Sequence, residues 1–378
     1  MAGQPLKRLD YIDNLRWVVI VLVLGVHAAV TYSHVGSWYY NSDVEPGLFE
    51  RLIFIAFQAS LQSFFMGLMF FLAGYFVPTG YDRKGFGRFM AERLFRLGVP
   101  SLIYVFVLHI GMGIFLLNWY GKTDPATAYG LYLDKGQWIN GTGPMWFAVA
   151  LLFFSFVYAL LRLVLPKPTT SSSSAAPSLT AILCLGLGMG AVTFLVRQFA
   201  PLGTAWHNMQ LAYFTQYVVL FALGILARRR GWVEALPPRW GMPVFLTALI
   251  GAPLSAIGLV LLSISTHAPQ NAFDGGLTWQ AAALAFWEQV FCVLFCTGLL
   301  ILFRDRVNAR TNWSRGFSDN GFAVYVIHPP ILVGITLAMR PLAWPALAMF
   351  AMAWIMALIA SFAVAAGLRA VPGVKRIL

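Results

Sequence analysis

Residues 15–33 read LRWVVIVLVLGVHAAVTYS, an almost unbroken apolar run with an arginine near its start and a histidine further in. A helix that crosses a bilayer needs about 20 mostly apolar residues. This run has that length, and it does not alternate apolar with polar residues as a strand of a membrane β-barrel does. It therefore predicts a membrane-spanning helix, whose backbone polar groups are bonded within the segment.

Runs of the same kind recur along the whole 378-residue chain. The composition agrees, because 59% of the residues are hydrophobic and 11% are charged, whereas a soluble domain carries about 25% charged residues. We expect an all-α fold, a polytopic transmembrane helix bundle of about ten helices that forms a single domain over residues 1–378. The predicted segments lie near 15–33, 54–77, 98–118, 144–165, 179–198, 212–228, 241–263, 281–303, 321–339 and 344–368.

The net charge of +12 arises from Lys and Arg residues that cluster in every second loop between the apolar runs. Twenty of the 26 lie in loops on one side of the predicted bundle and five on the other, with Arg16 at the mouth of the first helix. Because basic loops stay on the cytoplasmic side, we expect both termini in the cytoplasm and the protein in the inner membrane. The pattern indicates contact with membrane lipids and argues against a nucleic-acid partner.

Three local features refine this layout. Residues 166–178 are rich in serine and proline and predict a flexible cytoplasmic linker between the fourth and fifth helices. Lys7 and Arg8 precede the first run as in a signal peptide, but Arg16 begins the run and no A-x-A site follows, so we expect an uncleaved helix. Gly186 and Gly190 are four residues apart and predict close packing between helices.

His27 is the first candidate for chemistry. It follows Arg16 by 11 residues, which is roughly 16 Å of helix and places the histidine near the middle of the membrane. An ionisable group at that depth is costly and is a functional candidate by default. An imidazole there could deprotonate a hydroxyl group. The alternative is a histidine that packs against a neighbouring helix.

Arginines near the basic side form the second set of candidates. Arg16 lies three residues after Asp13, with which it could pair. It could clamp a phosphate or supply a charge that shapes the entrance to His27, or it could extend to lipid headgroups. Arg93 and Arg96 share one helical face, with Arg88 and Glu92 close by in the sequence. Two forked guanidinium groups on one face suit a polyphosphate. The alternative for this pair is the ordinary positive charge of a cytoplasmic loop.

Other polar residues in apolar surroundings carry less information. His328 precedes Pro329 and Pro330, which are expected to break or kink the ninth helix, and it is expected to satisfy carbonyl groups freed there more than to act in catalysis. Glu288 is expected to pair with a nearby cation. Aromatic residues of the outer loops form either an interfacial belt or a stacking platform for a sugar-like acceptor: Trp38, Tyr39, Tyr40, Trp119, Tyr120, Tyr129, Tyr132 and Trp138.

Five short motifs, in order along the chain, resemble those of the acyltransferase-3 family of membrane-bound O-acyltransferases. They are Tyr11-Ile12-Asp13-Asn14-Leu15-Arg16 followed by His27, Phe70-Phe71-Leu72-Ala73-Gly74-Tyr75-Phe76, the pair Arg93 and Arg96, Gly143-Pro144-Met145-Trp146-Phe147, and Tyr325-Val326-Ile327-His328-Pro329. The matches extend from residue 8 to about residue 330. Ala73 stands where the family more usually has serine, a difference that does not touch the candidate catalytic residues.

The resemblance implies transfer of an acyl group, often acetyl or succinyl, from cytoplasmic acyl-CoA to a hydroxyl group of a cell-envelope glycan or a small molecule. It implies a catalytic role for His27 and a role at the CoA end for Arg16, Arg93 and Arg96. Our hypothesis is that CoA phosphates bind Arg93 and Arg96, with Arg88 as a further ligand. The pantetheine arm then reaches between the helices to His27. His27 acts as general base or takes the acyl group itself, and these two routes stay open.

Two rival functions belong to other classes. A transporter or flippase exporting a lipid-linked or small polar molecule would share ten helices and aromatic outer loops. A sensor or scaffold would give no reason for a histidine one CoA arm away from an arginine pair. A transporter needs no release of thiol from acyl-CoA, which separates it from an acyltransferase. We expect no metal cofactor, and the sequence leaves the acyl chain, the acceptor and the oligomeric state open.

Overall fold

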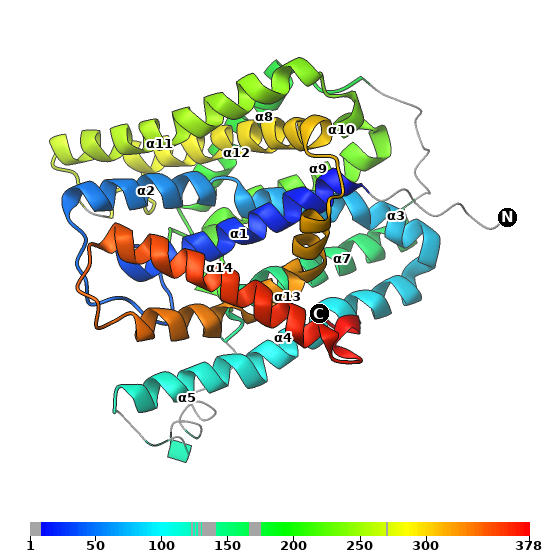
Figure 1. The fold of residues 1–378 in the computed structure, drawn as a ribbon. Helices are drawn as coiled ribbons and strands as arrows, with labels where there is room; N and C mark the ends of the chain where they lie inside the picture. Colours follow the sequence, from blue (N-terminus) through cyan, green and yellow to red (C-terminus); the bar gives the residue numbers. More distant parts are fainter. Residues whose placement is uncertain are drawn as a thin grey trace.

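The computed structural model describes residues 9–121, 124, 126–127, 130, 141–165, 175–269 and 271–378. Over these residues the fold is a bundle of α-helices, as predicted (Figure 1). The longer helices are α1 (Asp10–Ser33), α2 (Leu48–Gln62), α3 (Phe65–Arg93), α5 (Ile110–Trp119), α7 (Trp146–Val164), α8 (Leu179–Val196), α9 (Phe214–Arg230), α11 (Gly241–Ser265), α12 (Trp279–Arg306), α13 (Asn312–Ala338) and α14 (Ala346–Ala370).

Short elements connect these helices. They include two short α-helices, α4 (Val99–Ile103) and α10 (Trp232–Ala235), and two π-helices, η1 (Leu94–Gly98) and η2 (Tyr104–His109). There are also four 3-10 helices in the described chain: η4 (Gly143–Met145), η5 (Leu211–Tyr213), η6 (Pro238–Trp240) and η7 (Val374–Arg376). An antiparallel hairpin of β1 (Ala205–Trp206) and β2 (Met209–Gln210), in which Ala205 pairs with Gln210, was not predicted from the sequence. Most of the predicted linker at 166–178 lies outside the described residues.

Membrane-spanning character is confirmed for the described part of the chain. It contains nine helical stretches that are long and apolar enough to cross a membrane. One of them, Leu48–Trp119, is 72 residues long and holds two predicted segments, 54–77 and 98–118. In Figure 1 the chain runs one way through α2 and α3 and returns through α4 and α5. The non-helical backbone at Gly85, with φ 71° and ψ 176°, makes this reversal within the stretch.

The predicted segment 54–77 is not one continuous helix. The chain is helical from Leu48, is interrupted at Ser63–Phe64, and continues as α3 to Arg93. At the break, Gln216 donates its amide to the carbonyl oxygen of Ser63 at 2.5 Å. A free carbonyl in an apolar interior is tolerated when a side chain satisfies it. Gln216, which is far along the chain, therefore stabilises a helix break that the hydropathy of residues 54–77 does not reveal.

Close helix packing depends on glycine at two crossings. A Cβ atom at Gly74 would lie 2.1 Å from the carbonyl oxygen of Phe221, so α3 and α9 are in backbone contact. At Gly186 and Gly190 a Cβ atom would lie 2.9 Å and 2.7 Å from side-chain atoms of α12. Small residues let transmembrane helices approach this closely. The predicted packing role of Gly186 and Gly190 is therefore confirmed.

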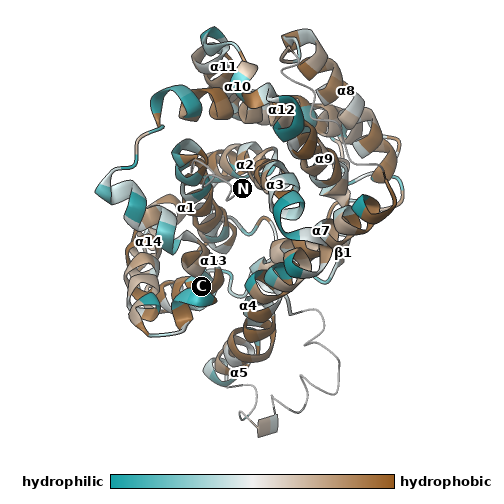
Figure 2. Ribbon diagram, turned by 90° about the vertical axis from the view of Figure 1, so that its right-hand side faces the viewer, coloured by the Kyte–Doolittle hydropathy of each residue, from teal (hydrophilic) through white to brown (hydrophobic). Residues whose placement is uncertain are grey.

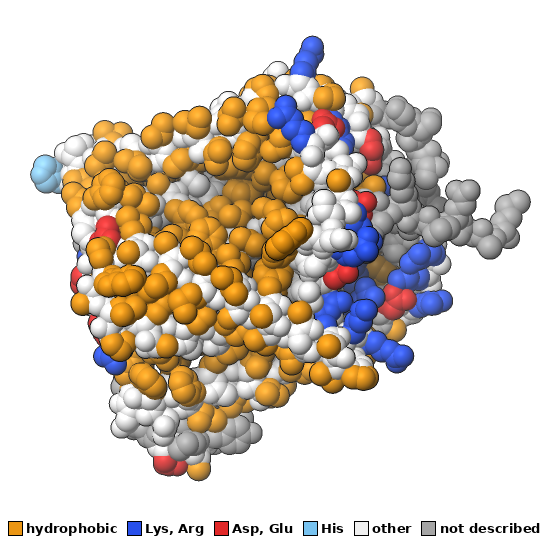
Figure 3. All heavy atoms as spheres, in the orientation of Figure 1, with side chains coloured by type: hydrophobic (Ala, Val, Ile, Leu, Met, Phe, Trp, Pro, Cys, Tyr) orange, Lys and Arg blue, Asp and Glu red, His pale blue; other side chains and the backbone are white. Residues whose placement is uncertain are grey.

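Helix α1 occupies the centre of the bundle and contacts α2, α3, α12, α13 and α14 (Figure 1). In the most apolar part of α1 and of α13, 67% of the residues are buried, against 22% in α8, α11 and α14. Hydrophobic side chains cover most of the visible face in Figure 3, and hydrophobic residues dominate the helices in Figure 2. The outer helices thus present apolar surface to lipid, and α1 and α13 lie inside.

Positive charge gathers at one end of the bundle, where Figure 3 shows most of the Lys and Arg side chains of the visible face. We call this the basic end. It is the end at which α1 begins and η7 lies, so both termini of the described chain share it (Figure 1). Residues 34–47, 266–269 and 271–278 lie at the opposite end, which we call the outer end.

Candidate active site

His27 lies on α1 with its side chain turned into the bundle. The small residues next to it, Gly25, Ala28 and Ala29, do not leave space for a ligand. Ala28 and Ala29 are fully buried, and a Cβ atom at Gly25 would lie 2.7 Å from the ring of Trp354. Those three positions are filled by helix packing, and the space next to His27 lies on another side of the helix.

A second histidine contacts His27 across the bundle. Nδ1 of His27 lies 2.9 Å from Nε2 of His328, a residue of α13 that is 301 positions away in the sequence. The two rings are nearly parallel, 7° apart, with centroids separated by 5.1 Å. Sequence analysis named His328 but did not connect it with His27. The signal that could have drawn attention to it was a second histidine at membrane depth.

The proline at 329 explains how His328 is oriented. In a helix, the carbonyl of residue 325 accepts a hydrogen bond from the N–H of residue 329, and proline has no such N–H. Nδ1 of His328 lies 2.8 Å from the Tyr325 carbonyl oxygen and donates to it in place of the missing group. The predicted role of His328 in satisfying a freed carbonyl is confirmed. Helix α13 is continuous through both prolines, so of the expected break or kink only a kink is compatible with the structure.

These two bonds assign the proton positions when both rings are neutral. A carbonyl oxygen only accepts, so Nδ1 of His328 carries its proton and Nε2 carries a lone pair. Nδ1 of His27 must then donate to that lone pair, which leaves Nε2 of His27 without a proton. No other described residue hydrogen-bonds to that nitrogen. The arrangement gives His27 a free basic nitrogen, the property that a general base or a nucleophile requires.

Trp38 covers one face of the His27 ring. The two rings are stacked, with centroids 4.0 Å apart and planes 13° apart. Hydrogen bonds of the neighbouring Tyr39 fix the loop that carries Trp38. The hydroxyl of Tyr39 lies 2.9 Å from the Tyr104 hydroxyl and 2.7 Å from Nδ1 of His109. Among the aromatic residues predicted for the outer loops, Trp38 therefore packs directly on the ring of His27. Tyr129, Tyr132 and Trp138 lie outside the described residues.

A cavity of about 590 Å³ extends inward from the basic end, and we call it the basic cavity. Its lining includes more basic than acidic side chains. They are Arg16, Lys84, Arg93, Arg96, Arg369, Lys375 and Arg376, against Asp13 and Glu92. A site with this excess of positive charge favours a polyanionic ligand.

The four predicted arginines differ in their relation to this cavity. Arg16, Arg93 and Arg96 line it together, although α1 and the α3–η1 segment are far apart in the sequence. Arg16 makes the predicted pair with Asp13 at 3.6 Å and also lies 4.7 Å from the ring centroid of Phe76. Arg88 is not a lining residue, since its side chain is 78% exposed and lies 3.5 Å from a Glu92 oxygen.

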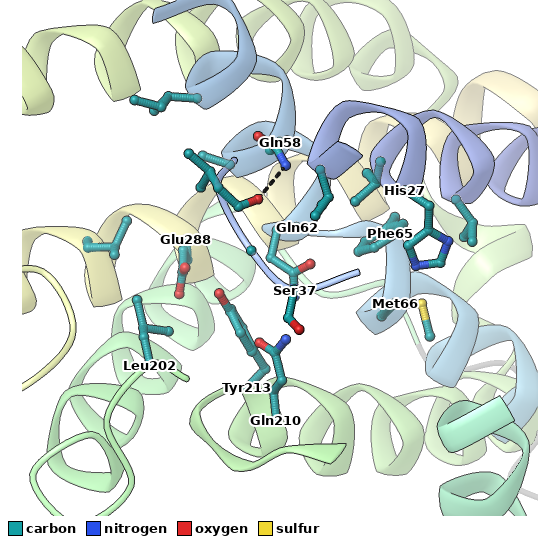
Figure 4. Close-up of a pocket in the computed structure, with 18 of the residues that line it drawn as sticks. His27, Ser37, Gln58, Gln62, Phe65, Met66, Leu202, Gln210, Tyr213 and Glu288 are labelled. Atoms are coloured by element: carbon teal, nitrogen blue, oxygen red, sulfur yellow. Dashed lines mark hydrogen bonds between the residues drawn. The ribbon is translucent and has the colours of Figure 1, made fainter. Parts of the chain in front are cut away.

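A second cavity, of about 510 Å³, lies on the outer side of His27, and we call it the outer cavity. His27 lines it, together with residues from the loop after α1, from the β1–β2 hairpin and from α12 (Figure 4). Val23, Met66 and Tyr325 line both cavities. The two cavities therefore share part of their walls one helical turn from His27. The basic cavity has a basic lining, and the outer cavity has a largely apolar lining with uncharged polar side chains and Glu288.

Glu288 lies in the wall of the outer cavity and is paired as predicted. Its carboxylate accepts a hydrogen bond from Nη2 of Arg197 at 2.5 Å, and the Arg197 side chain is fully buried. The sequence did not identify Arg197 as the partner, because the two residues are 91 positions apart. Among the described residues, no group of three or more His, Cys, Asp and Glu is placed to hold a metal ion.

Comparison with known proteins gives one family. A family model described as "Acyltransferase domain" matches residues 9–370. Glucans biosynthesis protein C of Shigella dysenteriae serotype 1 is 24% identical over 348 residues, which cover 88% of this chain and 84% of that protein. The protein of the same name from Escherichia coli O81 has the same identity and coverage. No solved structure matches the chain.

Proposed function

The chain belongs to this acyltransferase family, and from that premise we propose that it moves an acyl group from cytoplasmic acyl-CoA to a hydroxyl group. The acyl group is of the acetyl or succinyl class. The acceptor is a cell-envelope glycan or a small molecule, and the name of the 24%-identical relatives favours a glucan. One observation carries the proposal: the basic cavity and the outer cavity share lining residues beside His27, whose side chain lies inside the bundle and has a free basic nitrogen.

The basic cavity is the proposed donor site. CoA carries phosphate groups at one end and a thioester at the other, which matches a cavity that is basic at its mouth and apolar near Val23 and Met66. The guanidinium groups of Arg16, Arg93 and Arg96 hold the phosphates with charge-assisted hydrogen bonds. The extended arm then places the thioester next to the wall that the two cavities share.

His27 is the proposed catalytic residue, and His328 positions it. In one route, Nε2 of His27 takes the proton of the acceptor hydroxyl while that oxygen attacks the thioester carbon. The carbon–sulfur bond breaks, and the thiolate of CoA receives the proton from His27. In the other route, Nε2 attacks the thioester carbon and CoA leaves as its thiolate. The acceptor oxygen then attacks the acyl carbon, the bond from that carbon to Nε2 breaks, and the hydroxyl proton passes to the thiolate. Both routes need the unprotonated nitrogen that the bond to His328 provides.

The proposal also fixes an orientation. Acyl-CoA is a cytoplasmic donor, so the basic end, where both described termini lie, faces the cytoplasm. The protein then lies in the inner membrane. Reporter fusions after Leu378 and within the loop at 266–278 should then lie on opposite sides of the membrane. Finding the C-terminal fusion outside would contradict the donor route.

The activity itself is tested with purified protein in lipid nanodiscs. Acetyl-CoA and succinyl-CoA, each labelled on the acyl group, are supplied with a linear β-linked glucose oligosaccharide, and both free CoA thiol and labelled oligosaccharide are measured. The proposal predicts equal amounts of thiol and acylated product with at least one donor. Transport of the oligosaccharide across a vesicle membrane without thiol release would instead support the transporter.

A further inference from the structure

The outer cavity contains polar side chains that the proposed chemistry at His27 does not use. In Figure 4, Glu288 and Tyr213 project toward one another at one end of the cavity and His27 lies at the other, with Ser37, Gln62 and Gln210 between them. A cavity of about 510 Å³ is within the range of small-molecule sites. The polar end therefore has room to bind a part of the acceptor that is remote from the reacting hydroxyl.

The charge of this end is balanced inside the protein. A carboxylate within a membrane bundle is costly unless it is paired, and Arg197 pairs Glu288 while also lying 5.3 Å from the ring centroid of Tyr213. Only Glu288 of the ion pair lines the cavity. The pair has no net charge, so the cavity presents a strong hydrogen-bond acceptor without attracting a free cation or anion.

The rest of the outer-cavity lining combines amide groups with aromatic rings. The amide groups of Gln62 and Gln210 each offer both donors and acceptors. Aromatic rings provide flat apolar surface, since Trp146 and Trp287 line the same cavity. A pyranose ring has the matching surface, because its hydroxyl groups donate and accept at the edge while its C–H groups form apolar faces.

We propose that Glu288, Tyr213 and Gln210 form a recognition subsite for a neutral sugar ring of the acceptor. The Glu288 carboxylate accepts from a sugar hydroxyl, and the Tyr213 hydroxyl and the Gln210 amide bond to its neighbours. Binding at this end decides which hydroxyl group reaches Nε2 of His27, so contacts remote from the reaction supply its orientation. The identity of the reaction at His27 rests on the proposed function, whereas binding of the sugar does not.

The experiment measures binding in the absence of any acyl donor. A linear β-linked glucose oligosaccharide is titrated calorimetrically into the full-length protein in nanodiscs. Tyr213→Phe removes one hydroxyl group and should raise the dissociation constant about 2- to 12-fold, the range for a neutral hydrogen bond. Glu288→Gln removes a charged acceptor and should raise it about 10- to 150-fold.

The matched control is Tyr32→Phe. The Tyr32 hydroxyl is also buried, but it does not line either cavity, so its loss should leave the dissociation constant unchanged. Because Glu288→Gln leaves Arg197 without its partner, the melting temperature of each variant is measured alongside, and Tyr213→Phe carries the test if Glu288→Gln unfolds. An oligosaccharide of the same length built from uronic acids should bind more weakly than the neutral one.

The outcomes separate the subsite from the reaction. The subsite is supported if the neutral oligosaccharide binds the wild-type protein and Tyr32→Phe equally and binds Tyr213→Phe more weakly. This conclusion would hold even if no CoA thiol were released, because absence of thiol release would contradict only the proposed function. Acylation of the oligosaccharide with unchanged binding by Tyr213→Phe and Glu288→Gln overturns the subsite and leaves the proposed function standing. Absence of binding to the wild-type protein, or tighter binding of the acidic oligosaccharide, also overturns it.

Discussion

Replacing His328 by phenylalanine tests the pairing of the two histidines. Phenylalanine keeps a flat ring of similar size in the buried site on α13, but it has no nitrogen. Nδ1 of His27 then loses the acceptor that lies 2.9 Å away, and the Tyr325 carbonyl loses its donor at 2.8 Å. The His27 ring becomes free to exchange its proton between the two nitrogens, so Nε2 is no longer held unprotonated.

The size of the effect follows from the bonds that are lost. Leaving a buried polar group without its partner costs about 1 to 3 kcal/mol. If that cost falls on the positioning of Nε2, it corresponds to a decrease of about 5- to 150-fold in the rate of thiol release, because about 1.4 kcal/mol is tenfold in rate. The basic cavity is untouched, so affinity for CoA should stay within about twofold.

A conservative variant separates positioning from mere packing. In His328→Gln, the side-chain oxygen can accept from Nδ1 of His27 while the amide N–H donates to the Tyr325 carbonyl, so both bonds are kept. Initial rates of thiol release with saturating acyl-CoA, CoA affinity and melting temperature are measured for both variants. We expect His328→Gln to recover most of the rate that His328→Phe loses. Equal rates in the wild-type protein and His328→Phe, at similar melting temperatures, would refute the positioning role.

Three further predictions concern donor binding and stability. Arg93→Ala should weaken CoA binding about 10-fold or more, the scale of one charged hydrogen bond. Replacing the exposed Arg88 by alanine should change CoA affinity less than about twofold. Equal effects of the two variants in a fluorescent-CoA displacement assay would contradict the phosphate-binding role of Arg93. Arg197→Leu leaves a buried carboxylate unpaired and should lower the free energy of unfolding by about 3 to 5 kcal/mol, and an unaltered thermal transition in detergent would count against this. Gly74→Ala should cost about 1 to 3 kcal/mol because α3 and α9 must separate, whereas Gly188→Ala, with no atom within 4 Å of its added Cβ, should melt like the wild-type protein.

The membrane-spanning architecture was predictable because each span is a local property of the sequence. Apolar length indicates where the spans lie, and the 11 residues between Arg16 and His27 place the histidine well inside α1, away from the basic end. The break at Phe64 was not predictable in the same way. It depends on a side chain of α9 that satisfies the freed carbonyl of Ser63, and the hydropathy of residues 54–77 is continuous across it.

The candidate site was predictable only in part, because its residues come from helices whose order and rotation in the bundle the sequence does not state. The carbonyl left free by Pro329 could be deduced, and so could the role of His328 beside it. The contact between His328 and His27 joins residues 301 positions apart. The wall that the two cavities share at Val23, Met66 and Tyr325 depends likewise on how α1, α3 and α13 pack together.

The central claim is that Nε2 of His27 carries out the acyl transfer, and His27→Ala tests it most directly. Thiol release from acyl-CoA by the purified variant is compared with the wild-type protein in the presence of the oligosaccharide acceptor. We predict a loss of about 100-fold or more, the lower range of a catalytic acid–base contribution, with CoA affinity and melting temperature little changed. A variant that is folded, binds CoA and turns over at the wild-type rate would contradict the account.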